Sequence, residues 1–428
     1  MTLRHALRPS VLLAAALIGL GAPATWAQTA APWFARASLA LLHDSNFLRL
    51  ADTQAAPAGY TKADSVATGT LAAGFNQRFG TDQKVFVEAQ VQSNRLAHNR
   101  LFDNQGWGAR AGLDWRVGNI ASGEVRLRTD RSLASLESGT TGVPSQANLI
   151  TASSADAVFR VGRRTGFNGE AGVRWREVDN SVALFDSRDF HEGTAFLGVL
   201  YRPSELTTVG LAGRATRGSY PRYQALTGGG FRADDYEGRY VDLSVAYVLT
   251  GKSELYSRLS SGRIRHENAV QSDFSGLTGS LGWKWTPTAK LTLNTQLSRE
   301  PSQDAFFVSE ATGTRALEFS RISTSAVLAA TFRVSERFEI RAKASGIHRE
   351  LSQTLPLAGG ASVVISGSDR QVIGSLGATW QPTRMFSLGC DIGHDLRRGV
   401  APLSSDITNS SLGCQIQLSL GGPGIDLR

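Results

Sequence analysis

The chain of 428 residues has only two cysteines and 13 prolines. Two cysteines exclude a disulfide-rich scaffold, and their spacing leaves no CxxC pair for a structural zinc site. The low proline count argues against Pro-rich disorder, and the 45 glycines do not follow a collagen period. The formal net charge is +8 without a block of lysine and arginine, so the charge does not indicate nucleic-acid binding.

Long hydrophobic runs are also missing, except at the N-terminus. Arg4 and Arg8 precede an apolar stretch over residues 11–20, and small residues follow up to Ala27. This order is typical of a secretory signal peptide, so we predict one over residues 1–27. A membrane anchor is the alternative, but the run is shorter than the roughly 20 residues that a spanning helix needs.

The rest of the chain alternates between apolar and polar residues. Over 107–117, apolar residues occupy the odd positions, while Arg110, Asp114 and Arg116 occupy even ones. Successive side chains of a strand point to opposite faces, so this period of two predicts strands with one apolar face. About 18 such segments start near residues 35, 65, 83, 105, 119, 149, 165, 190, 205, 235, 252, 273, 289, 319, 336, 369, 384 and 406.

The connections between these segments alternate in length. Short turns such as Gly80-Thr81-Asp82 follow the even segments, and long polar loops follow the odd ones, including 44–63, 133–147, 218–234, 299–318 and 349–368. Short periplasmic turns opposite long extracellular loops are typical of outer-membrane barrels. We therefore predict an all-β fold, a transmembrane antiparallel up-and-down β-barrel over residues 28–420 with a tail at 421–428, located in the outer membrane.

Aromatic residues support this orientation. Ten of them stand on the apolar face close to the short turns: Trp115, Phe167, Tyr201, Tyr247, Trp283, Trp285, Phe332, Phe338, Trp380 and Phe386. Rings collected at one end of the strands are typical of the girdle at a membrane interface. The alternative is the core of a soluble protein, which does not require them to gather at one end.

The opposite, polar face is rich in arginine. Its basic candidates for lining a lumen are Arg110, Arg116, Arg126, Arg128, Arg160, Arg174, Arg176, Arg214, Arg258 and Arg341. Acidic residues such as Glu88, Asp114 and Glu124 share this face, so mutual neutralisation across strands is one interpretation. The other is a positive wall on the fourth to seventh segments that attracts anionic solutes. A barrel of about 18 strands is wide enough for an aqueous channel.

Histidines are few and scattered in the mature chain. They are His43, His98, His191, His266, His348 and His394, all at or near the extracellular ends of predicted strands. Neither a nucleophile motif nor a metal-ligand spacing such as HxxxH is present. We predict no enzyme activity, no catalytic or metal-binding residue and no cofactor, and we interpret these histidines as solvated.

The two cysteines fall on the apolar face of the last two segments. If that hairpin turns near residue 402, Cys390 and Cys414 lie directly opposite each other. Opposed residues of neighbouring strands come close enough for a disulfide. Two separate, lipid-facing thiols are the alternative.

Several stretches resemble the EpsL family of outer-membrane barrels, which is encoded with exosortase-linked exopolysaccharide genes. They are His43-Asp44-Ser45-Asn46-Phe47-Leu48-Arg49-Leu50, Gly106-Trp107, Asp114-Trp115-Arg116-Val117-Gly118-Asn119, Ser122-Gly123, Arg131-Ser132-Leu133-Ala134-Ser135-Leu136, Ser219-Tyr220-Pro221, Asp273-Phe274-Ser275-Gly276-Leu277-Thr278-Gly279, Trp283-Lys284-Trp285-Thr286-Pro287-Thr288 and Lys290-Leu291. The resemblance implies a role in exopolysaccharide production, with passage of a polymer, neutral or anionic, through the outer membrane beside periplasmic synthesis components. It implies no catalytic residues. A general or anion-preferring porin for small solutes is the alternative function, and a closed structural barrel is a third.

One feature departs from the usual barrel pattern. Outer-membrane barrels commonly end in an aromatic residue, whereas the last apolar strand position here is Leu420. The usual assembly signal is therefore in doubt, although the last strand is not.

Overall fold

A computed structural model describes residues 32–80, 82–134, 147–163, 165–226, 229–310, 313–356, 362–401 and 403–421. The predicted signal peptide at 1–27 and the tail beyond Gly421 lie outside the described residues. The strands are β1 (Trp33–Asp44), β2 (Asp64–Phe79), β3 (Gln83–Leu96), β4 (Asn104–Val117), β5 (Ala121–Leu133), β6 (Leu149–Gly162), β7 (Gly166–Asn180), β8 (Phe190–Ser204), β9 (Thr207–Ala225), β10 (Phe231–Thr250), β11 (Ser253–His266), β12 (Phe274–Trp285), β13 (Leu291–Glu310), β14 (Gly313–Ser335), β15 (Phe338–Pro356), β16 (Ser362–Trp380), β17 (Phe386–Arg398) and β18 (Ile407–Gly421).

Three short 3-10 helices interrupt the connections at one end: η1 (Arg100–Phe102), η2 (Ala183–Arg188) and η3 (Val270–Ser272). No helix in the described part of the chain is long and apolar enough to cross a membrane.

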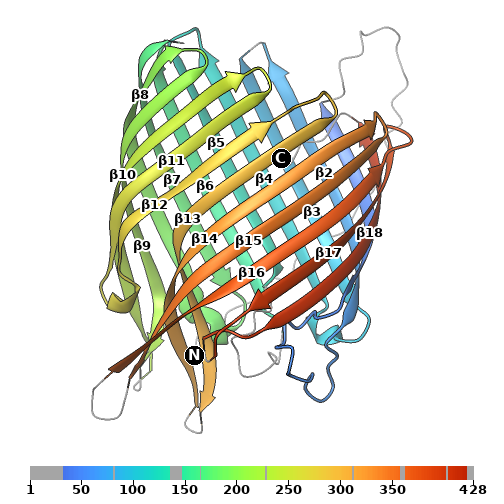
Figure 1. The fold of residues 1–428 in the computed structure, drawn as a ribbon, viewed down its shortest axis with the longest axis vertical. Helices are drawn as coiled ribbons and strands as arrows, with labels where there is room; N and C mark the ends of the chain where they lie inside the picture. The colour runs from blue at the N-terminus through green and yellow to red at the C-terminus, as the bar shows by residue number, and fades with distance from the viewer. Residues whose placement is uncertain are drawn as a thin grey trace, which may run out of the picture.

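The strands form one closed, antiparallel barrel (Figure 1). Each strand pairs with its neighbours in sequence, and β1 closes the ring by pairing with β18 from Phe34↔Gly421 to Asp44↔Ser411. Within this ring every strand has a partner on both sides, which is the condition for a sheet in lipid. The prediction of an 18-stranded barrel is confirmed.

The two ends of the barrel differ, as the connection lengths predicted. We call the end with the short turns, such as 251–252 between β10 and β11, the turn rim. The opposite end, with connections such as 45–63 between β1 and β2, is the loop rim.

Three of the predicted loops are largely wrong. Residues 218–225, 299–310 and 349–356 continue β9, β13 and β15, and the partner strands cover most of the remainder. The hairpins β13–β14 and β15–β16 therefore extend past the other strands (Figure 1). Outside a bilayer a strand no longer needs an apolar face, so the alternation that we used to find strands is lost while the backbone pairing continues.

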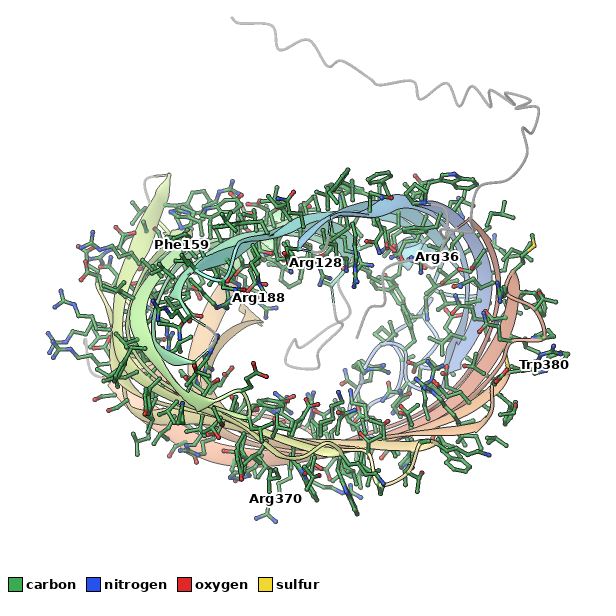
Figure 2. All side chains as sticks on the ribbon, turned by 90° about the horizontal axis from the view of Figure 1, so that it is seen from above. Arg36, Arg128, Phe159, Arg188, Arg370 and Trp380 are labelled. Carbon is green, nitrogen blue, oxygen red and sulfur yellow. A yellow bond between two sulfur atoms is a disulfide. The ribbon has the colours of Figure 1, made fainter. Side chains whose placement is uncertain are left out.

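The two faces of the wall have opposite polarity. Apolar side chains point outward and stay exposed, with Leu39 at 72%, Leu197 at 70% and Phe167 at 74% relative exposure. The ten aromatic residues predicted for the girdle all fall on this exterior face by register. Trp380 points away from the ring in the view along the barrel, while Arg36 and Arg128 point inward (Figure 2). An exposed apolar band of this size fits a lipid-covered surface.

A recurring carboxylate organises the loop rim. The strand that enters a connection donates its last backbone amide to the aspartate that directly precedes the next strand, as Leu96 does to Asp103 and His266 to Asp273, both at 2.7 Å. The amides of Asn180 and Gly399 make the same contact with Asp189 and Asp406. The bond from Leu96 lowers the pKa of Asp103 below its ordinary value. Aspartate suits these positions because its short side chain satisfies backbone amides locally.

The cysteines pair. Cys390 stands opposite Cys414 in the β17–β18 register, and the two form a disulfide with a Cα–Cα distance of 4.1 Å. The structure therefore supports the cross-strand disulfide over two separate thiols.

Candidate functional site: the inner wall and the loop-rim mouth

The register places the ten predicted arginines on one face. Residues that are paired across neighbouring strands share a face of the sheet. Followed from strand to strand, the pairs put all ten arginine positions, from β4 to β15, on the same face. Arg128, one of the ten, points into the ring (Figure 2). Arg110, Arg116, Arg126, Arg128, Arg160, Arg174, Arg176, Arg214, Arg258 and Arg341 thus all face the lumen.

Most of these arginines pair with carboxylates across strands. Arg126 contacts Asp114 and Glu124, and Arg160 contacts Glu124 and Glu170. Because these contacts share Glu124, one chain of ion pairs connects β4, β5, β6 and β7. The interpretation of mutual neutralisation holds for these pairs, as it does for Arg174–Asp156, Arg128–Asp130, Arg214–Asp242 and Arg258–Glu300.

Neutralisation on this wall is incomplete. The inner face of β4 to β7 carries seven arginines against the five carboxylates Asp114, Glu124, Asp130, Asp156 and Glu170. Among the described residues, Arg116 and Arg176 of this wall form no ion pair, and Arg341 on β15 donates instead to the hydroxyl of Thr379 at 2.8 Å. The arginine excess therefore remains as a net positive charge on one side of the lumen.

The ten predicted arginines are not the complete inward-facing set, and Arg36 and Arg349 are two that we did not identify from the sequence pattern. Arg36 on β1 shares the carboxylate of Glu88 with Arg110, at 3.1 and 2.8 Å. Arg349 on β15 forms a bidentate pair with Asp369 at 2.6 and 2.7 Å, and both are almost fully buried. Arg36 occupies a polar position in the alternating pattern of β1, so the sequence offered a signal for it. Arg349 fell in a segment predicted to be a loop.

Inward-facing aromatic rings lie over glycines of neighbouring strands. The Tyr256 ring occupies the space above Gly282, where a Cβ atom would be 1.8 Å from it. The Tyr240 ring covers Gly262 in the same way and also stacks under the guanidinium of Arg214, 4.0 Å from the ring centre. Glycine leaves room for a ring to lie flat on the sheet, so the rings line the wall instead of crossing the lumen.

The stretch His43–Leu50 forms part of the mouth at the loop rim. Asn46 is fully buried, and its side chain makes hydrogen bonds of 2.8 and 3.0 Å with the backbone of Leu50. Arg49 has a φ of +54°, which residues other than glycine seldom adopt, and Asp44 holds it through two bonds of 2.9 Å. This stretch therefore fixes the start of the β1–β2 loop.

An apolar cluster anchors the same loop on the inner side. Leu48 and Leu50 pack with Leu96 and Phe102, which are all buried, and with Val66. Val66 and Leu96 are a register pair on the inward face of β2 and β3. The β1–β2 loop consequently packs against the lumen side of the wall and narrows the mouth.

The histidines do not behave alike. His43 and His394 are exposed and contact serine hydroxyls at 3.0 Å. His266 is buried, with its Nδ1 2.7 Å from the carboxylate of Asp234, so the interpretation of a solvated side chain is wrong for this residue. Among the described residues, no group of three His, Cys, Asp or Glu side chains is placed to hold a metal ion.

Asp234 ties the loop after β11 to the wall. Burial raises the pKa of this carboxyl, but hydrogen bonds from His266 and from the amides of Asn268 and Ala269 outweigh it and hold the pKa below its ordinary 3.8. The contacts join the start of β10 to the connection at 267–273. They stabilise the rim, beyond the apolar band of the exterior.

No family model and no curated protein matches the chain. Among solved structures, the outer membrane protein OpdK from Pseudomonas aeruginosa is similar with a TM-score of 0.45 and 12% identity, covering 91% of this chain and 99% of that one. A ferric enterobactin receptor (PfeA) variant from the same organism is similar with a TM-score of 0.44 and 9% identity, covering 90% of this chain and 81% of that one. The ferric-catecholate import receptor Fiu from E. coli has a TM-score of 0.42 and 9% identity, covering 92% of this chain and 82% of that one. These likenesses are too distant to carry function.

Proposed function

We propose that this protein is an outer-membrane channel whose polar lumen passes hydrophilic molecules, and that its cargo is an exopolysaccharide leaving the cell. The polarity of the wall supports the channel, since exposed apolar residues lie outside and a network of ion pairs lies inside. Charged residues at this density are stable on a face that water reaches. In the view along the barrel, no described side chain crosses the middle of the ring (Figure 2).

The resemblance to the EpsL family supports the polysaccharide cargo. The wall offers guanidinium groups and rings that lie flat, such as Tyr240 and Tyr256, and both suit a sugar polymer. An anionic polymer gains most from the arginine excess on β4 to β7. Periplasmic synthesis components would then meet the barrel at the turn rim.

An anion-preferring porin for small solutes is the second candidate. The same arginine excess favours it, because a positive wall raises the local concentration of any small anion. Export differs from this alternative in the size of the cargo and in its dependence on a polymer-synthesis system.

Two experiments separate these functions. Deletion of the gene, followed by measurement of surface polysaccharide, should reduce polymer output, and unchanged output refutes export. Purified protein in planar bilayers should give stepwise current, and its absence refutes an open channel. Current with an anion preference and normal polymer output in the deletion strain would identify the small-solute porin.

A further inference from the structure

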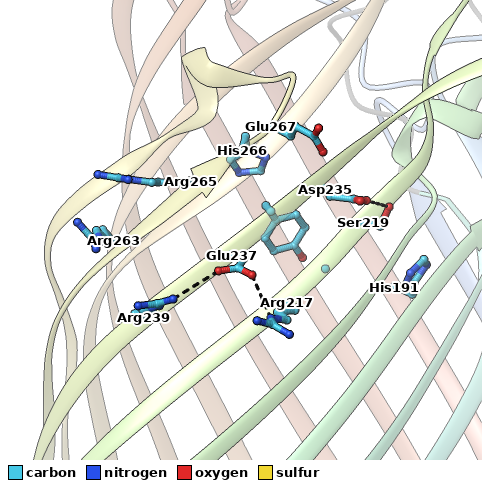
Figure 3. A pocket seen from close by; sticks show the side chains of 12 residues that line it. His191, Arg217, Ser219, Asp235, Glu237, Arg239, Arg263, Arg265, His266 and Glu267 are labelled. Atoms are coloured by element: carbon cyan, nitrogen blue, oxygen red, sulfur yellow. Dashed lines mark hydrogen bonds and ion pairs between the residues drawn. The ribbon is translucent and has the colours of Figure 1, made fainter.

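The exterior of the barrel carries a groove of about 790 Å³ next to the loop rim, over β9, β10 and β11 (Figure 3). We call its four arginines and their central carboxylate the basic groove: Arg217, Arg239, Arg263, Arg265 and Glu237. All five face outward, because they alternate with the inward residues of the same strands.

The basic groove begins where the apolar band ends. On β10 the exterior positions are apolar from Leu249 up to Val241, and the next one is Arg239. On β11 the exterior Leu259 is followed, after one serine, by Arg263. Val241 and Leu259 are both more than half exposed. A lipid that covers them brings its headgroup level with the two arginines.

The groove is short of counter-charge. Arg239 and Arg263 stand directly opposite each other in the β10–β11 register, a placement in which like charges repel. Glu237 lies 3.1 Å from Arg217 and 3.7 Å from Arg239. In the part of the chain that the structure describes, Arg263 and Arg265 form no ion pair. An anion between the facing guanidinium groups would remove the repulsion.

Two further carboxylates indicate the direction from which that anion arrives. Asp235 and Glu267 line the groove on the side away from the apolar band, and the backbone amide of Glu267 donates to the carbonyl of Asp235. They repel a dissolved anion that approaches from the solvent side. An anion carried along the membrane by acyl chains meets the arginines first.

We propose that the basic groove binds the phosphorylated headgroup of an outer-leaflet glycolipid, whose acyl chains lie against Val241 and Leu259. Guanidinium groups form paired, charge-assisted hydrogen bonds with phosphate oxygens, and the facing pair Arg239 and Arg263 can share one phosphate. This inference rests on the proposed outer-membrane location and does not depend on what passes through the lumen.

The test is a count of bound lipid A on the full-length, detergent-solubilised barrel by native mass spectrometry. The double variant R239Q/R263Q should bind bisphosphorylated lipid A with about tenfold lower affinity than the unchanged protein. The control R95Q/R299Q removes two exterior arginines that have their own partners, Asp103 and Glu350, and should bind as before. Heat-modified mobility on gels checks that each variant is folded.

Each outcome has a definite meaning. Equal loss in both double variants, or no loss in R239Q/R263Q, overturns the proposal. Inorganic phosphate at millimolar concentration should not displace lipid A, and full displacement overturns the lipid assignment in favour of a simple anion site. Absence of channel current with intact lipid binding refutes the proposed channel alone, whereas normal current without lipid binding refutes this inference alone.

Discussion

Replacing Glu88 by glutamine tests how the inner wall is stabilised. The Glu88 side chain is 6% exposed and accepts from two guanidinium groups, those of Arg36 and Arg110. The Nε atoms of both arginines are buried without a partner, so Glu88 is the main source of compensation for two positive charges. The variant E88Q keeps the shape of the side chain and one acceptor, but it removes the charge.

The expected cost follows from this burial. Breaking a buried ion pair from one side costs about 3–5 kcal/mol, since the remaining charge stays desolvated. We expect the lower end, about 3 kcal/mol, because glutamine still accepts one hydrogen bond. Removing this carboxylate also leaves the wall with one more net positive charge. The anion selectivity of the channel should therefore rise.

Urea titrations in lipid vesicles, followed by tryptophan fluorescence, measure the change in unfolding free energy. Reversal potentials in a salt gradient measure selectivity. The matched control is E254Q, since Glu254 also faces inward but is 55% exposed and lies 3.7 Å from Lys284. It should cost about 0–1 kcal/mol. Equal losses of unfolding free energy for E88Q and E254Q would show that Glu88 is as solvated as Glu254. That result would refute the reasoning.

Three further predictions concern the frame of the barrel. Gly282→Ala should lower stability by about 1–3 kcal/mol, because the new methyl group meets the ring of Tyr256; urea titration measures it. Cys390→Ser should destabilise the last hairpin by about 2–4 kcal/mol, and thiol counting should find free thiols in the unchanged protein only after reduction. The pKa of Asp234 is lowered in the folded state, so its contribution with His266 is present above pH 3.8 and lost as the pH falls below it; acid titration of stability measures this.

Each of these has a control. Gly213→Ala, at a position with no atom within 4 Å of the new Cβ, should be neutral, and a loss equal to that of Gly282→Ala would contradict the ring contact. Reduced protein should match the stability of Cys390→Ser, so a large difference between them would point to a packing effect. D234N should flatten the acid dependence below pH 3.8, and an unchanged slope would assign it to other carboxylates.

Much of the wall could be predicted because it repeats a simple rule. A strand in a barrel wall shows its outer residue to lipid and its inner residue to water, so polarity records its face at every second position. The alternation predicted Arg110 and Arg126 on the polar face, and the register puts both positions on the inner face. The rule fails where both faces meet water, and for that reason Arg349 was missed and the outer ends of the hairpins β13–β14 and β15–β16 were predicted to be loops.

Local alternation and connection length were enough to predict the strand count, the two rims and the polar inner face. They could not predict which charges meet, because that depends on the pairing of strands in space. The pairing of Arg36 with Glu88 depends on residues 52 positions apart, and the facing of Arg239 with Arg263 depends on the register of a hairpin. Register is set by the backbone ladder as a whole, and a shift by one residue would move every side chain to the other face.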